Sequence, residues 1–381
     1  MTLSRRKTLA LLGGGFIVAA GGAAGLAVTR TPHSALAPWA AAGGYADPRM
    51  NALSYAILAP NPHNRQPWLV DLRRAGEVTL HVDTDRLLPY TDPFNRQIVV
   101  GLGCFLELMT LAAAAQGYGV ELDLFPDGED PGGLDTRRVA VARFAQGAGV
   151  PAPDLFAHVM QRRSLKEPYD ITRPVDPTVL EDVIAAAERT KVEGTVAPDD
   201  IATLRKISHA ALRIEIETPH TYKESVDLFR IGSREVEVNP DGIDFSGPAF
   251  EAMALTGVFS REAALDQSSM AYRGGLKAVF ENTDTAMGHI WQVTPTNTRT
   301  DQINAGRDWL RLNLATTRAG LGMQPLSQGL QEYPEMSDIY RELHARFAPD
   351  GGAVQMFARI GYGPQVGQSP RWPLERKILE G

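Results

Sequence analysis

The pattern of apolar and polar residues predicts a helix, a strand and a longer helix in the first third of the chain. Apolar residues recur at helical spacing behind Asp47-Pro48, a helix cap followed by proline at the first helical position. Residues 78–82 alternate between apolar and polar side chains, which is typical of a half-buried strand. Residues 96–116 carry a long apolar face, and we expect that helix to end at Gly117 and Gly119, because glycine is favoured just past a helix C-terminus.

The rest of the chain continues to mix helical and strand patterns, so we expect an α+β protein. Residues 139–144 and 355–360 are predicted strands, and residues 181–238 are predicted to be a run of charged amphipathic helices. Residues 126–136 are rich in Pro, Gly and Asp and predict a loop. Met and Phe are scattered irregularly through residues 249–290, where no element can be assigned.

Part of the helix at 96–116 recurs later in the chain. Five residues reappear at one offset of 203 positions: Gly103, Leu111, Ala112, Gly117 and Gly119 as Gly306, Leu314, Ala315, Gly320 and Gly322. Both copies are predicted helices that end in Gly-x-Gly, which favours a duplicated half-domain. The Gly- and Pro-rich residues 145–153 are the expected boundary, so the halves would span residues 45–150 and 151–381.

The composition narrows the class of function. The 381 residues are 44% hydrophobic and 22% charged, with a formal net charge of -7. These values are ordinary for a globular protein and unlike those of a nucleic-acid binder with a basic face. Cys104 is the single cysteine, so an internal disulfide is excluded, and its apolar neighbours predict a buried structural thiol. No third ligand accompanies His81 and Asp83 at a suitable spacing, so no metal site is predicted.

The first residues, 1–37, have the pattern of a targeting segment. Ser4-Arg5-Arg6-Lys7 precedes residues 8–28, which carry no charge, and Ala35-Leu36-Ala37 offers small residues for cleavage. The start resembles a twin-arginine signal, although Thr8 stands where that pattern prefers an aromatic residue. We therefore expect recognition by the export machinery and a periplasmic location. The alternative is an uncleaved anchor in the inner membrane, since 21 uncharged residues in a helix would reach about 30 Å.

A loop of unusual composition, Asn-Pro-His-Asn-Arg-Gln-Pro-Trp, occupies residues 61–68. Its two prolines exclude a helix or a central strand, because proline lacks a backbone donor and restricts the residue before it. The loop presents Asn64 and Gln66, whose amides both donate and accept hydrogen bonds and so suit the polar edge of a heteroaromatic ring. The alternative is a turn built from ordinary turn residues.

A basic segment, residues 162–169, is the second candidate site. Arg163, Ser164 and Lys166 place a planar guanidinium, a hydroxyl and a point charge close together in sequence. This set suits a phosphomonoester. The alternative is the solvated basic end of a helix, which the helix dipole also favours.

These two segments resemble motifs of the nitroreductase family of FMN-dependent oxidoreductases. The Asn-x-Gln-Pro-Trp loop with Asn64 and Gln66 is similar to the family's flavin-contacting loop, in the variant of the Acg-like branch. Arg163, Ser164 and Lys166 stand where the family has Arg-Ser-x-Arg before an aromatic residue, its phosphate signature. Lys in place of the second Arg offers a point charge without bidentate geometry, which is a departure from the family's pattern.

Two later motifs add to the resemblance. Gly322, in Gly-Met-Gln-Pro-Leu, resembles the Gly-rich turn beside the isoalloxazine, where small residues let the backbone approach the ring. Arg371 precedes the Pro-Leu near the C-terminal end and resembles the family's last basic contact to the cofactor phosphate. The resemblance covers residues 45–378 with its motifs in the expected order.

The resemblance implies a fold, a cofactor and an activity. We expect an α+β, nitroreductase-like fold in which two half-domains of one chain mimic the family homodimer, so that a monomer holds the cofactor, FMN. The expected activity is a two-electron transfer through flavin N5, from a small-molecule donor to an electron-poor small-molecule acceptor, with no catalytic side chain. The alternative is a non-catalytic flavoprotein that holds or stores FMN.

Overall fold

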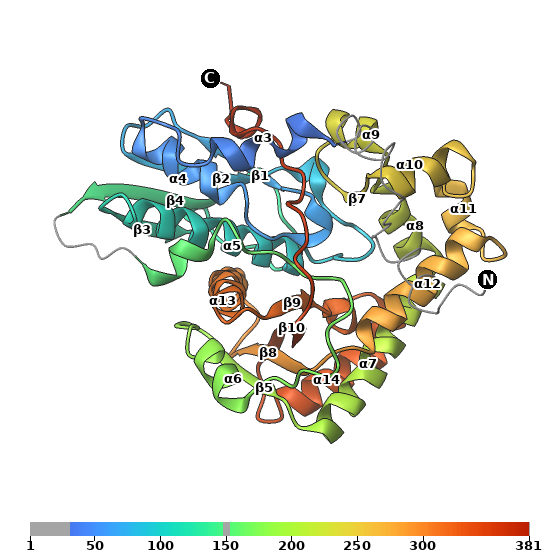
Figure 1. The fold of residues 1–381 in the computed structure, drawn as a ribbon. Helices are drawn as coiled ribbons and strands as arrows, with labels where there is room; N and C mark the ends of the chain where they lie inside the picture. Colours follow the sequence, from blue (N-terminus) through green and yellow to red (C-terminus); the bar gives the residue numbers. More distant parts are fainter. Residues whose placement is uncertain (1–30, 148–152, 381) are drawn as a thin grey trace.

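The computed structural model describes residues 31–147 and 153–380, which form two halves with the same strand order (Figure 1). The first half is an antiparallel sheet in the order β1-β2-β4-β3: β1 Trp68–Asp71, β2 Glu77–Val82, β3 Tyr118–Leu124 and β4 Arg138–Gln146. The second is an antiparallel sheet in the order β5-β8-β10-β9: β5 Lys191–Thr195, β8 Gly288–Thr294, β9 Gly322–Pro325 and β10 Ala353–Gly361.

The helices repeat in the same way. Helix α4 (Pro48–Ala56) precedes β1, and α6 (Pro177–Ile184) precedes β5. Helix α5 (Arg96–Ala114) joins β2 to β3, and α13 (Arg299–Arg318) joins β8 to β9. The predicted α+β architecture with two half-domains in one chain is therefore confirmed.

Helices α5 and α13 cross in the centre of the molecule at two of the glycines that the sequence repeat paired. A Cβ added at Gly103 would overlap the carbonyl oxygen of Ile303, and one added at Gly306 would overlap that of Val100. The two contacts are equivalent under the offset of 203 residues, as expected for copies related by an approximate twofold axis. Glycine is needed at both positions because a side chain would push the helices apart.

Both helices also end as predicted. Gly117 and Gly320 have φ of +79° and +71°, a conformation that favours glycine and follows a helix C-terminus. The chain then enters β3 in the first half and β9 in the second.

The main apolar core extends across both halves, with α5 and α13 lying between the two sheets (Figure 1). Phe105, Trp309 and Ile360 are among its buried side chains. Cys104 is buried as predicted: its thiol donates to the carbonyl oxygen of Gly306 at 3.1 Å, and burial raises its pKa to about 12. Among the described residues, α5 is the one helix long and apolar enough to cross a membrane, but most of it is buried, as expected of a core helix.

The largest difference between the halves lies between their first two strands. Residues 72–76 form a short turn between β1 and β2, whereas residues 196–287 separate β5 from β8. We call residues 196–287 the insertion. It contains α7 Pro198–Glu217, α8 Pro219–Asp227, α9 Ser233–Val238, α10 Pro248–Leu255, α11 Arg261–Leu265, α12 Met270–Thr283 and a parallel pair of strands, β6 Phe229–Ile231 and β7 Ile243–Phe245.

One predicted run of helices is wrong in part. Residues 181–238 include α6 to α9, but they also include the strands β5 and β6. Strand β5 pairs with β8 along its whole length, and a Cβ at Gly194 would lie only 2.7 Å from the carbonyl oxygen of His289. The extended conformation of β5 is determined by its pairing with β8, and the local sequence pattern carries no information about that pairing.

The two ends of the described chain return to the first half. Ile378 forms a parallel bridge with Val70, after α14 (Ser337–Phe347) and β10. Helix α3 (His33–Ala41) contacts α4 of the first half and also α9 of the insertion. Residues 1–30 of the predicted targeting segment and residues 148–152 at the predicted boundary lie outside the described residues, so both remain predictions.

Candidate functional site

The loop at residues 61–68 is strained. Pro62–Asn64 form a short 3-10 helix between α4 and β1. His63, Asn64 and Gln66 have φ of 46°, 52° and 51°, in the left-handed region. Such a conformation costs about 1–3 kcal/mol per residue when the residue is not glycine, so contacts with other parts of the chain must hold the loop.

Asn64 and Gln66 both bind the C-terminal segment. The Asn64 side-chain oxygen accepts a hydrogen bond from Arg371 at 2.6 Å. The fully buried Gln66 donates through Nε2 to the carbonyl oxygen of Pro240 at 2.6 Å, and its Oε1 accepts from the backbone N–H of Trp372 at 2.9 Å. Partners within the protein therefore already occupy the hydrogen-bonding groups of the Gln66 side chain. Contact between Gln66 and a flavin ring stays a prediction, and it would require these hydrogen bonds to break.

Three arginines, Arg162, Arg163 and Arg371, gather beside this loop, and we call them the arginine cluster. Arg162 and Arg371 both donate to the carbonyl oxygen of Leu58, at 3.0 and 3.1 Å. The guanidinium carbons of Arg163 and Arg371 lie 4.8 and 5.8 Å from the ring centroid of Trp39. In the described part of the chain the cluster's hydrogen-bond acceptors are neutral oxygens, and none of the three forms an ion pair with a carboxylate.

Burial without a counter-charge makes the cluster electrostatically unfavourable. Burial, and then the charges of Arg162 and Arg163, lowers the pKa of Arg371 to about 9. Burial, and then the charge of Arg163, lowers the pKa of Arg162 to about 10, and burial also lowers the pKa of Arg163. The buried Nε of Arg371 has no hydrogen-bond partner among the described residues. A bound anion with several acceptor oxygens would satisfy both the charge and the free donor.

The other predicted residues lie next to the cluster. Ser164 is half-buried and Lys166 is exposed. Burial, and then the charge of Lys166, lowers the pKa of His63 to about 4. Gly322 begins β9, and a Cβ there would overlap the side chain of Leu165, so the basic segment lies directly against this strand.

Arg359 on β10 fixes the basic segment, a role that the sequence pattern did not reveal. It is buried and donates to the backbone carbonyl oxygens of Lys166 and Glu167, at 3.1 and 2.9 Å. It also donates to the Gln324 side chain on β9 at 2.6 Å, and its guanidinium carbon lies 4.0 Å from the ring centroid of Tyr169. A guanidinium can make these contacts at once because its five donors form a rigid fork.

Helix α3 covers the arginine cluster, although residues 1–37 have the pattern of a targeting segment. Trp39 donates through its indole N–H to the carbonyl oxygen of Ser369 at 2.8 Å. Ala35 is buried, and its carbonyl oxygen accepts from the backbone N–H of Arg371 at 2.8 Å. The predicted cleavage site, Ala35-Leu36-Ala37, therefore lies inside a packed helix, and cleavage after Ala37 would remove the Ala35 contact.

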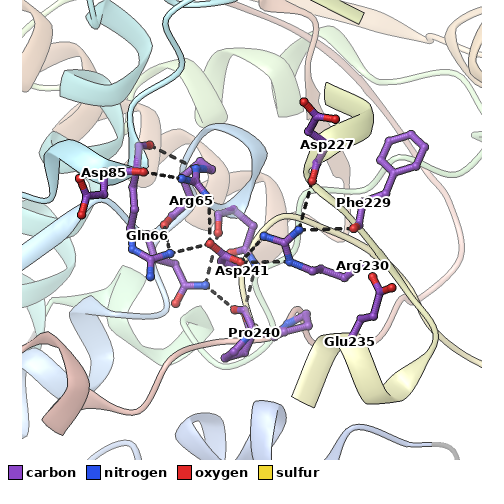
Figure 2. Close-up of polar contacts among 12 residues, drawn as sticks. Arg65, Gln66, Asp85, Asp227, Phe229, Arg230, Glu235, Pro240 and Asp241 are labelled. Atoms are coloured by element: carbon purple, nitrogen blue, oxygen red, sulfur yellow. Dashed lines mark hydrogen bonds and ion pairs between the residues drawn. The ribbon is translucent and has the colours of Figure 1, made fainter. Parts of the chain in front are cut away.

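The insertion reaches the same loop through three consecutive residues (Figure 2). Pro240 accepts from Gln66, as described above, and the backbone N–H of Gly242 donates to the carbonyl oxygen of Asn64 at 3.3 Å. Between them, Asp241 accepts from Arg65 at 2.8 Å. Residues 64, 65 and 66 thus each contact one of residues 240, 241 and 242, and we call this contact the clasp.

Asp241 is the charged centre of the clasp. Its buried carboxylate also accepts from Arg86 at 2.5 Å and from Arg230 at 2.7 Å. Figure 2 shows the carboxylate between Arg65 and Arg230, which come from the loop and from the insertion. Local sequence patterns do not reveal this role, because Asp241 meets Arg86 and Arg65 through tertiary contacts between residues 155 and 176 positions apart.

Comparisons with known proteins bear on the family resemblance of the whole chain. No protein-family model matches the chain. It is 26% identical over 347 residues to a Mycobacterium tuberculosis protein provisionally named NAD(P)H nitroreductase acg, with 87% of this chain and 93% of that protein covered.

The chain is similar in sequence to proteins named as nitroreductases.

A second M. tuberculosis protein provisionally named an NAD(P)H nitroreductase, Rv3131, is 23% identical over 329 residues, with 86% of this chain and 88% of that protein covered. Among solved structures, a protein of Anabaena variabilis provisionally described as a nitroreductase aligns with a TM-score of only 0.39 at 12% identity, over 76% of this chain and 69% of that one.

The structure brings most of the predicted residues of this nitroreductase-like chain together. Asn64 and Arg371 are in direct contact, and Arg163 joins Arg371 on the ring of Trp39. Ser164 and Lys166 follow in the same segment, and that segment packs on Gly322. Gln66 lies behind the loop rather than at its surface. A cofactor-binding role for all seven residues remains a prediction.

Proposed function

We propose that the arginine cluster binds the phosphate of FMN. The observation that carries this proposal is a set of three buried or half-buried arginines that face only neutral oxygens in the described chain. A phosphate monoester is the ligand that fits, since guanidinium groups bind its oxygens in pairs and its charge offsets theirs. The free Nε of Arg371 supplies a further donor.

We infer that the chain is a nitroreductase-like oxidoreductase. When bound, FMN would supply two-electron exchange through its N5, and the protein would supply position and polarity. The chain's own residues would do three things. The arginine cluster would hold the phosphate, the strained loop at 61–68 would fix the edge of the site, and α3 with Trp39 would exclude water from the cluster.

Identification of the cofactor is the first test. Protein purified as expressed should release FMN on heating, identified by mass spectrometry. Release of FAD, or no flavin binding by the apo-protein on titration, would exclude the proposal.

Titration of the apo-protein with FMN then tests the cluster. Arg163→Ala is the informative variant, because Arg163 is only half-buried and is the least structural of the three arginines. It should weaken FMN binding about tenfold to a hundredfold, corresponding to about 1.5–3 kcal/mol for a hydrogen bond to a charged group. Arg341→Ala, on the exposed face of α14, is the control and should leave the dissociation constant unchanged.

A flavoprotein that holds FMN without turning over is the second candidate. The clasp favours it, because the insertion is fixed to the loop beside the arginine cluster through a buried carboxylate. The mycobacterial relatives are named for NAD(P)H, and steady-state oxidation of NADH or NADPH by the FMN-loaded protein separates the two candidates. Turnover with a nitroaromatic acceptor supports the enzyme, and bound FMN that no donor reduces supports the holding protein.

A further inference from the structure

The insertion has an apolar outer surface in addition to its own interior. Four half-buried phenylalanines of the insertion pack against one another, three of the pairs edge to face: Phe229, Phe245, Phe250 and Phe259. Yet of the nine large apolar side chains that the described chain exposes, six lie between residues 238 and 279. Single exposed apolar residues are normal, but their concentration in one segment marks a surface that meets an apolar partner.

Helix α10 shows the feature most clearly. Its sequence, Pro-Ala-Phe-Glu-Ala-Met-Ala-Leu, contains one charged residue, but none of its residues is buried. A helix that is apolar all round is expected in a core or against a membrane. Leu255 is 77% exposed and Met270, at the start of α12, is 74% exposed; Val258 and Leu265 between them are exposed as well. We call these four residues the apolar tip.

The described chain begins along the same edge of the molecule. Helix α3 contacts α9, and the backbone N–H of Ser34 donates to the Glu237 carboxylate at 3.1 Å. Val238, the last residue of α9, is 64% exposed. Helices α9 and α10 both contact β6, and α3, α9, α10 and α11 follow one edge in Figure 1.

The residues before α3 indicate what lies at that edge. Residues 8–28 carry no charge and are numerous enough to span a bilayer as a helix. Val28 stands three positions before Thr31, so the chain between them reaches at most about 10 Å. A spanning segment would therefore hold the α3–α9 edge at the bilayer surface. Cleavage after Ala37 would remove the buried Ala35 and its hydrogen bond with the backbone N–H of Arg371.

We propose that the apolar tip of the insertion docks on the lipid bilayer in which residues 8–28 are anchored. Its side chains enter the boundary between headgroups and acyl chains, as those of interfacial helices do. The insertion that clasps the loop at 61–68 then lies on the membrane side of the molecule. Docking does not depend on the proposed cofactor or activity.

Site-specific fluorescence of the full chain in phospholipid vesicles tests the docking. Leu255→Cys carries a polarity-sensitive fluorophore, and the buried Cys104 does not compete for the label. Asp338→Cys, an exposed position on α14, is the matched control (Figure 1). With spin-labelled acyl chains in the vesicles, the fluorophore at position 255 should be blue-shifted and quenched several-fold more than the one at position 338. Equal emission and equal quenching at the two positions would overturn the proposal.

A variant of the tip provides the second measurement. Val258→Cys is labelled in the wild-type background and in a background with Leu255→Asp and Met270→Asp. Because both replaced residues are exposed, the melting temperature should not change, while the lipid quenching at position 258 should be lost. Two results would overturn the proposal. The first is quenching that rises with protein density but not with spin-labelled lipid, which indicates a second copy on the tip. The second is recovery of the expressed protein from the soluble fraction in a form that has lost residues 8–28.

Discussion

Gln66 acts, on the geometry described above, as a residue that positions the loop. Gln66→Ala would leave the backbone N–H of Trp372 and the carbonyl oxygen of Pro240 without their partners inside the protein. We expect a loss of about 1–3 kcal/mol in the free energy of unfolding, the cost of unsatisfied buried polar groups. Urea unfolding measures it, with Gln267→Ala at an exposed loop position as the control. Equal stability of the two variants would contradict the positional role.

Glu215 gives the protein a predictable response to pH. It is buried on α7, and burial raises its pKa from 4.5 to about 7, against the opposing hydrogen bonds of Gln328 and Gln331. Between about pH 4.5 and about pH 7 the folded protein binds a proton that the unfolded chain does not, so this group makes stability fall as pH rises through that range.

Glu215→Gln tests this sign, because a neutral amide cannot titrate. The variant should lack the part of the stability decrease between about pH 4.5 and about pH 7 that Glu215 causes. Urea unfolding of both proteins at the two pH values measures the difference. A wild-type slope that the substitution leaves unchanged would show that Glu215 titrates normally.

Side-chain chemistry in the sequence indicated part of the candidate site and missed part of it. Asn64, Arg163 and Arg371 were indicated because motif spacing carries information about them. The burial of Arg162 and the role of Trp39 were missed, since each depends on contacts far along the chain, such as the bond from Arg162 to Leu58 across 104 positions. The local pattern of apolar and polar residues does not reveal partners at such distances along the chain.

The elements that the sequence predicted well are those with a strong apolar period. Helix α5 and strands β2, β4 and β10 begin and end within a few residues of their predicted limits. Strand β5, Lys-Val-Glu-Gly-Thr, has one apolar residue between charged ones, and no period distinguishes it from its helical neighbours. Its extended conformation comes from pairing with β8, an example of strand structure set by context.

The crossing of α5 and α13 allows a matched pair of substitutions. Gly306→Ala would force a Cβ into the carbonyl group of Val100 and should destabilise the protein by about 1–3 kcal/mol or more, as overpacking does. Gly275→Ala lies on α12 with no atom within 4 Å of the new Cβ, and should stabilise it by up to about 1 kcal/mol. Thermal unfolding of both variants measures the difference, and loss of stability only in Gly275→Ala would contradict the crossing geometry.

At the scale of the whole molecule, the candidate site is assembled from both halves of one chain. Asn64 lies in the first half, whereas Arg163 and Arg371 lie in the second half, residues 151–381. The shared core means that the halves are expected to unfold together. The duplication of a half-domain followed from the repeat, but the contact of residues 240–242 with the loop did not, because it joins residues that lie far apart along the chain.

A monomer should therefore be sufficient for cofactor binding. Light scattering combined with flavin absorbance should find one FMN bound to a particle with the mass of a single chain. Both the wild-type protein and the Arg163→Ala variant are measured after reconstitution with FMN. The variant shows how much flavin binds non-specifically, outside the arginine cluster. Flavin that elutes only with a dimer would contradict the expectation.

The reciprocal packing of Gly103 and Gly306 has an evolutionary consequence. In an assembly of two identical chains, every mutation appears in both copies, so neither copy can change alone. Once two copies are encoded in tandem, each codon is independent, and the symmetry is free to decay wherever it is not needed for packing. This chain has kept the symmetry at the central crossing and lost it at the periphery, where one copy has a short turn and the other has acquired six helices and a pair of strands. The ancestral pairing is preserved as scaffold, and the specialised features of this protein are expected in its asymmetric parts.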